Sequence, residues 1–374
     1  MSTVTRPRDP VGPRSVRAPL LPRLALLAPA GVALLAGLDA ALMLLGLPAP
    51  VTVDRLPEVH GMLMVLGFVG TLIAVERAVA LRQPTGFVAP ALLGLGALVL
   101  LSPAPLVAGQ GILTVGAAAL VGLYVPLWRR QRDEAVLVQA LAAVLALGAA
   151  VLWLGGTTVP LLAPWLVGFV VLTIAGERLE LARIAMGPSA GIVLVLLAAG
   201  LVAGVLAALL WPRPGTVLLG AALLVLTGWL ASHDVARRTI RTSGLTRYMA
   251  GCMLAAYCWL GVAGAVWLLG GPAPDGVRYD AVLHAVFLGF ALSMIMAHAP
   301  VILPAVLRRP LPYRAALVAP AVLLHASLVM RLWAGDALGS RGAWVTGGVL
   351  NVVAVLWFLV VAGGSTVRGD RRRS

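Results

Sequence analysis

The sequence predicts an all-α membrane protein built from twelve transmembrane helices. Of its 374 residues, 61% are hydrophobic and only 11% are charged, which excludes an ordinary water-soluble globular protein. The chain divides into apolar runs of about 20 residues, the length that crosses a bilayer. Its basic residues gather in alternate connections between these runs, as expected of a chain that passes back and forth across a membrane.

The twelve apolar runs are bounded by proline, glycine and arginine. They cover residues 22–47, 57–81, 87–107, 109–128, 134–156, 161–184, 189–211, 215–233, 248–271, 279–304, 313–335 and 342–364. Lipid offers backbone groups no hydrogen-bond partner, so each run is predicted to be a helix. The connections are too short to hold a soluble domain, and residues 22–364 are therefore expected to form one transmembrane unit.

The two ends of the chain differ in composition from the spans. Residues 1–21 are polar and rich in proline and arginine, and they lack the apolar core of a signal peptide, which predicts a disordered cytoplasmic tail. Residues 365–374 predict a second basic cytoplasmic tail. The two cysteines, Cys252 and Cys258, share one apolar run and are interpreted as packing residues rather than as a disulfide framework or a metal site.

The arginines predict the orientation of the chain. All 28 basic residues are arginine, and the formal net charge is +14. With a cytoplasmic N-terminus, 23 arginines fall on the inner side of twelve spans. The five others are Arg55, Arg213, Arg278, Arg331 and Arg341. We therefore expect a multi-pass protein of the cell inner (cytoplasmic) membrane with both termini inside. No basic stretch interleaved with aromatic residues accompanies these arginines, so nucleic acid is not an expected partner.

A repeat recurs every four spans. The second span contains Gly67-Phe-Val-Gly-Thr-Leu-Ile-Ala-Val-Glu-Arg77, and the sixth contains Gly168-Phe-Val-Val-Leu-Thr-Ile-Ala-Gly-Glu-Arg178, with seven of eleven positions identical. The tenth span offers a weaker copy, in which Gly289-Phe290 is followed by His298 at the position of Glu76 and Glu177. We expect three four-helix arcs related by this repeat, although chance similarity between apolar helices is the alternative.

Histidines within spans are candidates for function, because burying an ionisable group in hydrocarbon is unfavourable. His60 and His284 lie a few residues into the second and tenth spans, both near the outer face. Two level histidines on facing helices match the axial ligands of a low-spin haem, expected here to be of the b type. The alternative is two unrelated histidines that are hydrogen-bonded within the bundle.

A second polar group is predicted at the inner end of the bundle. Glu76, Glu177, His298 and His325 are candidates for a proton relay or a site for copper or another metal ion. Alternatively, the carboxylates pair with Arg77, Arg178 and Arg183 in a structural ring at the cytoplasmic rim. His298 lies fourteen residues after His284 on the same helix, but no second histidine at its level supplies the partner of another haem.

The run His60-Gly61-Met62-Leu63-Met64 resembles the second helix of haem-copper oxidase subunit I, where a His-Gly-x-x-Met run supplies one ligand of the low-spin haem. Twelve helices in three arcs are also that family's architecture. The resemblance implies that His284, in the tenth span, is the other ligand. It further implies that Arg331 and Arg341, near the connection between spans eleven and twelve, contact the haem propionates.

The departures from that family are informative. The sixth and seventh spans contain no histidine, and Val282 and Val286 flank His284, so the copper ligands of an oxygen reductase are missing. The chain also resembles, more loosely, the NnrS-type proteins of twelve helices, which carry haem and copper and respond to nitric oxide stress. His284-Ala285 with Gly289 carries that likeness.

The sequence therefore predicts a haem-binding membrane protein that acts in electron transfer or the nitric oxide response, with a redox partner at its outer face and without oxygen-reductase activity. No catalytic residue is assigned. Two alternatives are a proton-coupled or metal-ion transporter that uses the intramembrane Glu/His relay, and a structural subunit without chemistry of its own. No nucleophile–base motif, phosphate loop or zinc spacing indicates any other class of enzyme.

Overall fold

The computed structural model of the protein describes residues 21–307 and 311–370, and in this part of the chain every regular element is a helix. The tail predicted over residues 1–21 lies outside the described residues except for Leu21, and so do residues 371–374. The last helix continues to Asp370, whereas the sequence predicts its end at residue 364.

The helices follow one another with short connections. In chain order they are α1 Leu21–Leu44, α2 Leu56–Met62, η1 Leu63–Gly70, α3 Thr71–Leu81, η2 Pro84–Phe87, α4 Val88–Leu100, α5 Leu106–Gln131, α6 Glu134–Leu154, η3 Val159–Leu162, α7 Ala163–Met186, α8 Ala190–Leu210, α9 Pro212–His233, α10 Ala236–Thr239, α11 Gly244–Gly270, α12 Gly276–His284, η4 Ala285–Leu292, α13 Ser293–Leu307, η5 Ala315–Leu317, α14 Val318–Val329, η6 Met330–Ala337 and α15 Arg341–Asp370.

Eleven of the continuous helical stretches in the described residues are long and apolar enough to cross a membrane. The sequence predicts twelve, and the difference is the third. Pro84–Leu100 is apolar but shorter than the others, because α4 stops at Leu100 instead of reaching residue 107. The cause is local: Pro103 has no N–H to donate to the carbonyl of Val99, which accepts the Ser102 hydroxyl at 2.8 Å instead.

Three stretches form the interior of the bundle: Leu56–Leu81, Val159–Met186 and Gly276–Pro304. In these, 72%, 72% and 67% of the most apolar window is buried, against 56% or less in the other eight. They are the second, sixth and tenth predicted spans, which carry the repeated Gly-Phe sequence. Direct contacts join them, since η4 packs on α7 and α13 packs on α3.

The second and tenth spans also share a change in helix type. Each contains one π-helical segment of eight residues, η1 over Leu63–Gly70 and η4 over Ala285–Leu292. When Gly67-Phe68 is aligned with Gly289-Phe290, the two segments coincide from end to end. The corresponding part of α7 is an ordinary α-helix. Because π-helical segments occur often at functional sites, they draw attention to His60 and His284, which lie just before them.

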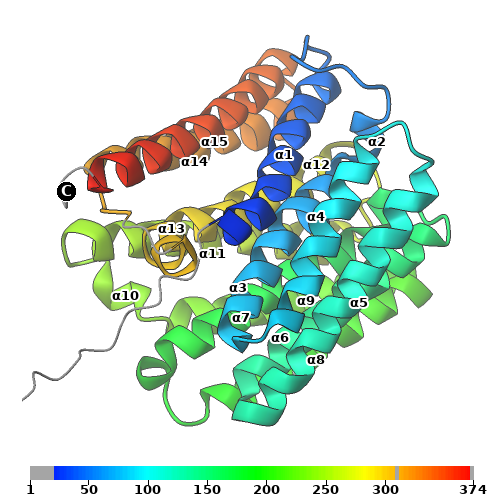
Figure 1. The fold of residues 1–374 in the computed structure, drawn as a ribbon. Helices are drawn as coiled ribbons and strands as arrows, with labels where there is room; N and C mark the ends of the chain where they lie inside the picture. The colour runs from blue at the N-terminus through cyan, green and yellow to red at the C-terminus, as the bar shows by residue number, and fades with distance from the viewer. Residues whose placement is uncertain (1–20, 308–310, 371–374) are drawn as a thin grey trace, which may run out of the picture.

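The remaining helices surround this interior (Figure 1). Figure 1 shows α14 and α15 side by side with α1 on one side of the bundle, and α5, α6 and α8 on the opposite side. Their outward faces expose many large apolar side chains, such as Leu196, Leu210 and Val360, as expected of surfaces in contact with lipid. Cys252 and Cys258 are both free; Cys252 is buried, as expected of a packing residue, whereas Cys258 is exposed.

The ends of the helices follow from particular residues. The Asp133 carboxylate caps α6 by accepting the Ala135 N–H at 2.8 Å, which satisfies a free donor at the start of the helix. Gly271 ends α11 with a φ of +67°, a conformation that glycine adopts without a side-chain clash. The positions of these helix ends set the lengths of the helices, and therefore how far along the bundle their polar residues lie.

Candidate functional site

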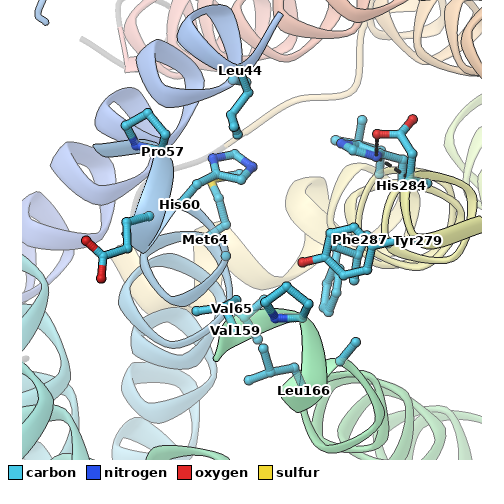
Figure 2. A pocket seen from close by; sticks show the side chains of 18 of the residues that line it. Leu44, Pro57, His60, Met64, Val65, Val159, Leu166, Tyr279, His284 and Phe287 are labelled. Atoms are coloured by element: carbon cyan, nitrogen blue, oxygen red, sulfur yellow. Dashed lines mark hydrogen bonds and ion pairs between the residues drawn. The ribbon is translucent and has the colours of Figure 1, made fainter. Parts of the chain in front are cut away.

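A cavity of about 670 Å³ lies at the end of the bundle where α2 and α12 begin. Both His60 and His284 line it, and Figure 2 shows them on opposite sides of the space. The cavity is bounded by ends of several helices that lie far apart in sequence, among them α1, α5, α14–η6 and α15. We call it the histidine cavity. Its volume falls in the range of about 300–1,000 Å³ that is typical of sites for small molecules and cofactors.

Most of the wall of the histidine cavity is apolar. The side chains that face it from different elements include Leu44, Met64, Val65, Leu106, Val159, Leu166, Phe287, Leu288 and Val355. Figure 2 shows Met64 and Val65 on the side of His60, and Phe287 and Tyr279 on the side of His284. An apolar wall with a few polar groups is the usual composition of a cofactor site.

The ring of His284 is oriented by Asp280, one turn earlier on α12. Its Nδ1 lies 2.9 Å from the main-chain oxygen of Asp280 and 3.2 Å from the carboxylate Oδ1. Two oxygen acceptors at Nδ1 place a proton on this nitrogen, and in the neutral ring the lone pair is then on Nε2. A histidine whose Nδ1–H is held by a carboxylate or carbonyl is the usual arrangement of a metal-ligating imidazole.

His60 has an unsatisfied ring nitrogen. Its Nδ1 is buried and has no hydrogen-bond partner among the described residues. Burying a polar atom without a partner is unfavourable by about 1–3 kcal/mol, so an orphaned nitrogen in a cavity wall calls for an explanation. A bound group that supplies the missing interaction is one such explanation.

The two predicted arginines occupy different places. Arg331 is buried and lines the cavity, and it forms a two-pronged salt bridge in which Nε and Nη2 lie 2.8 and 2.6 Å from the two carboxylate oxygens of Asp280. Arg341 is exposed, donates to the Leu45 carbonyl at 3.3 Å, and is not part of the cavity wall. Both guanidinium groups lie over the ring of Trp344, at 5.1 and 4.4 Å from its centroid.

At the opposite end of the bundle, one of the two predicted glutamates, Glu76, pairs with Arg77, and the other, Glu177, lies near this pair. Arg77 is buried and lies 2.6 Å from Glu76 Oε1 and 3.0 Å from Glu180 Oε2, and its Nη1 also donates to Gln139 at 3.1 Å. Glu177 lies near this group, since it interacts electrostatically with both Glu76 and Arg77.

His298 belongs to a separate buried network. Arg178 donates through Nε and Nη2 to both oxygens of Asp234, at 2.8 and 3.0 Å, and its Nη1 lies 2.9 Å from Nε2 of His298. Tyr257 also donates to Asp234, at 2.6 Å. Burial alone raises the pKa of Asp234, but the hydrogen bonds and charge of Arg178 outweigh it and hold that pKa below its usual value.

His325 lies in a third place, where its Nδ1 accepts from the Trp259 indole at 3.0 Å and its Nε2 lies 3.4 Å from the Ser293 hydroxyl. The four residues of the predicted inner group are thus divided among three sets of partners. Across residues 21–307 and 311–370, no group of three or more His, Cys, Asp or Glu side chains is arranged to hold a metal ion.

The alternative prediction, a ring in which the glutamates pair with Arg77, Arg178 and Arg183, is met only in part. Glu76 does pair with Arg77, but Arg178 pairs with Asp234 rather than with a glutamate. Arg183 is half exposed and pairs with Asp133 and with Glu134, the latter at 3.1 Å. Arg178 is not available to a glutamate, because its Nε and Nη2 both donate to the carboxylate of Asp234, at 2.8 and 3.0 Å.

Sequence reasoning missed several residues of these sites. Asp280, Trp344 and Asn351 line the histidine cavity, and Tyr124 and Glu180 lie at the opposite end of the bundle, near Arg77. One signal was available: Asp280 precedes His284 by four residues, the spacing at which side chains on a helix meet. Trp344 and Asn351 carry no such signal, because only the packing of α15 brings them to the cavity.

The fold and the cavity define a polytopic helical membrane protein with a histidine-lined, largely apolar cavity at one end. The chain belongs to the family described as domain of unknown function (DUF8744), whose family model matches residues 23–367 and so covers nearly the whole transmembrane unit. The matching model is not one of haem-copper oxidase subunit I or of NnrS. No curated protein and no solved structure matches the chain.

Proposed function

We propose that this protein binds one haem of the b type in the histidine cavity, with His60 and His284 as its axial ligands. The observation that carries the proposal is that these two histidines, 224 positions apart in the sequence, line one apolar cavity of about 670 Å³. The orientation of the His284 ring fits the role, since its Nδ1 is held by Asp280 and its Nε2 is left for a ligand. When bound, a haem supplies reversible one-electron chemistry.

The charged groups of the cavity wall suit the acidic edge of a haem. Arg331 uses Nε and Nη2 for Asp280, and its Nη1 has no hydrogen bond with the described residues. That N–H group is available to a propionate, and arginine pairs well with carboxylates. Arg341 lies outside the cavity wall, so we assign it an indirect role through Trp344, which it contacts together with Arg331.

We further propose that the shorter helix Pro84–Leu100 also crosses the membrane, which gives twelve spans in three four-helix arcs. At about 1.5 Å per residue it is somewhat shorter than a bilayer core of about 30 Å, which a thinned bilayer or flanking side chains accommodate. Twelve spans keep 23 of the 28 arginines on one side. Both termini then lie in the cytoplasm, the protein lies in the inner membrane, and the cavity opens near the outer face, where a redox partner docks.

The proposed role is electron transfer or the nitric oxide response, by resemblance to haem-copper oxidase subunit I and NnrS. Oxygen reduction is not proposed, because α7 and α8 carry no histidine for a copper centre. A separate copper ion finds no support either, since no three-ligand group is present among the described residues. Fold likeness alone does not transfer a reaction, so the cofactor must be tested directly.

The test is an absorbance spectrum of the purified protein, oxidised and reduced with dithionite, after expression with haem supply. We expect a Soret band and a b-type signature by pyridine haemochrome analysis. His60→Ala and His284→Ala are each expected to abolish stoichiometric binding. His233→Ala is the matched control, because His233 is exposed and stacks on Trp229 outside the cavity. Unchanged haem content in both cavity variants overturns the proposal and favours a structural subunit, whose histidine variants lose a partner complex instead.

Proton-coupled or metal-ion transport is a second candidate function, favoured by one observation. Glu76 pairs with Arg77, and Glu177, at the equivalent position of the repeat, lies near them. Buried carboxylates of this kind often mark ion and proton pathways. Neutralising Glu177 is then expected to abolish flux in proteoliposomes and to leave any haem spectrum unchanged, whereas unaltered flux argues against this candidate.

A further inference from the structure

At the inner end of the bundle, acidic side chains outnumber basic ones in one cluster. We use the name acid–arginine cluster for Glu76, Arg77, Tyr124, Glu177 and Glu180, which come from α3, α5 and α7. Arg77 satisfies two carboxylates directly, Glu76 at 2.6 Å and Glu180 at 3.0 Å. Three carboxylates and one guanidinium leave two negative charges in excess if all four groups are ionised.

Glu177 is the carboxylate without a partner. It makes no hydrogen bond or ion pair with any residue in the described part of the chain. The charged groups that act on it are Glu76 and Arg77 from α3 and Glu180 and Arg178 from its own helix. Arg178 does not neutralise it, because that guanidinium already holds both oxygens of Asp234.

Tyr124 gives an independent indication. Its side chain is 2% exposed, its hydroxyl has no hydrogen-bond partner among the described residues, and it interacts electrostatically with Arg77 and all three glutamates. A phenol O–H both donates and accepts, so an orphaned hydroxyl beside a partnerless carboxyl suits a shared proton. Nε of Arg77 is likewise buried without a partner.

We propose that Glu177 is the proton-binding group of the acid–arginine cluster and that it takes up a single proton from water on the side of the membrane that this cluster faces. The step forms one O–H bond on a carboxylate oxygen of Glu177, breaks one O–H bond of hydronium, and lowers the excess negative charge by one. Glu180, whose side chain is 40% exposed, and Glu76, at 24%, connect the group to the surface.

A proton suits this site better than a metal ion, since no three-ligand metal group is found within the described ranges. The proposal deepens the second candidate function by naming its proton-carrying residue. It stands whether or not the protein transports protons, because the experiment below measures protonation rather than flux.

The experiment is infrared difference spectroscopy of the full chain in lipid nanodiscs, titrated through neutral pH. We expect the carbonyl stretch of one protonated carboxylic acid, which disappears in Glu177→Gln and remains in Glu134→Gln. Glu134 is the matched control, because it is 40% exposed and pairs with Arg183, a residue that also holds Asp133. A band that survives in Glu177→Gln, or no band in the wild type, overturns the proposal.

Two further variants test the neighbours without removing the carboxyl. Tyr124→Phe is expected to shift the frequency of the band by removing the hydroxyl, and a band unchanged in frequency contradicts the role of Tyr124. Glu76→Gln is expected to change the pH dependence of the band, because it removes a nearby like charge. An unchanged midpoint excludes shared protonation within the acid–arginine cluster.

Discussion

His284 and Asp280 are joined on α12 by two contacts to the same ring nitrogen, 2.9 Å to the main-chain oxygen and 3.2 Å to the carboxylate. Asp280 in turn accepts from Arg331 and from the Trp344 indole, the latter at 3.3 Å. One carboxylate therefore orients the histidine of α12 and ties it to η6 and α15. A ligand held in this way keeps its ring orientation when the metal is absent.

Asp280→Asn is expected to weaken haem binding by about 10–100-fold, the usual effect of removing the carboxylate behind a metal-ligating histidine. The measurement is titration of the haem-free protein with haem, followed by absorbance. Asp275→Asn is the control on the same stretch of chain, because Asp275 is exposed and its side chain caps no helix. Equal affinities of Asp280→Asn and the wild type contradict this role.

Arg331→Gln is expected to destabilise the protein by about 3 kcal/mol, because it leaves the charge of Asp280 without its partner in a largely buried place. Arg341→Gln is expected to change stability by no more than about 0.5 kcal/mol, since Arg341 is exposed. The two variants are compared by thermal unfolding in the same detergent. Equal losses for both arginines contradict the assignment of Arg331 to the cavity wall.

Acid is expected to destabilise the protein through Asp234. Because the pKa of Asp234 is lower in the folded than in the unfolded state, its contribution to stability is complete above the unfolded value of about 3.9 and is lost as pH falls through the folded pKa. Asp234→Asn should lower Tm at neutral pH, since it leaves Arg178 uncompensated, and should flatten the acid limb.

The measurement for Asp234 is Tm as a function of pH, with Asp54→Asn as the control. Asp54 is exposed and lies in the connection between α1 and α2. If the Tm of Asp234→Asn falls with decreasing pH as steeply as that of the wild type, Asp234 is not the source of the acid sensitivity.

Gly220→Ala is expected to destabilise the protein by about 1–3 kcal/mol through overpacking. An added Cβ would lie 2.4 Å from the main-chain nitrogen of Leu268 and 2.8 Å from the carbonyl of Gly264, so α9 and α11 must move apart. Gly228→Ala, on the same helix with nothing within 4 Å of the new Cβ, should be neutral or stabilising by up to about 1 kcal/mol. Thermal unfolding distinguishes them, and equal effects contradict the close contact.

The sequence predicted the class of fold and, for several polar residues, the end of the bundle at which they lie. His60 and His284 were expected at one end and on facing helices, because each begins an even-numbered span; the structure brings both to one cavity. The second, sixth and tenth spans, which carry the predicted repeat, are the most buried stretches among the described residues. The end of α4 at Leu100 was missed, because the hydropathy of residues 101–107 hides a turn that the prolines impose.

By itself, the sequence determined that this chain is a helical membrane protein, and it predicted near which ends of the spans the polar residues lie, because hydropathy and helix rise follow from the order of residues along the chain. Only the tertiary structure decided which of these groups meet. Arg178 pairs with Asp234, 56 positions away, and Trp344 reaches Asp280 across 64. Such partners depend on how each helix is rotated and packed against the others, which no local pattern of residues specifies.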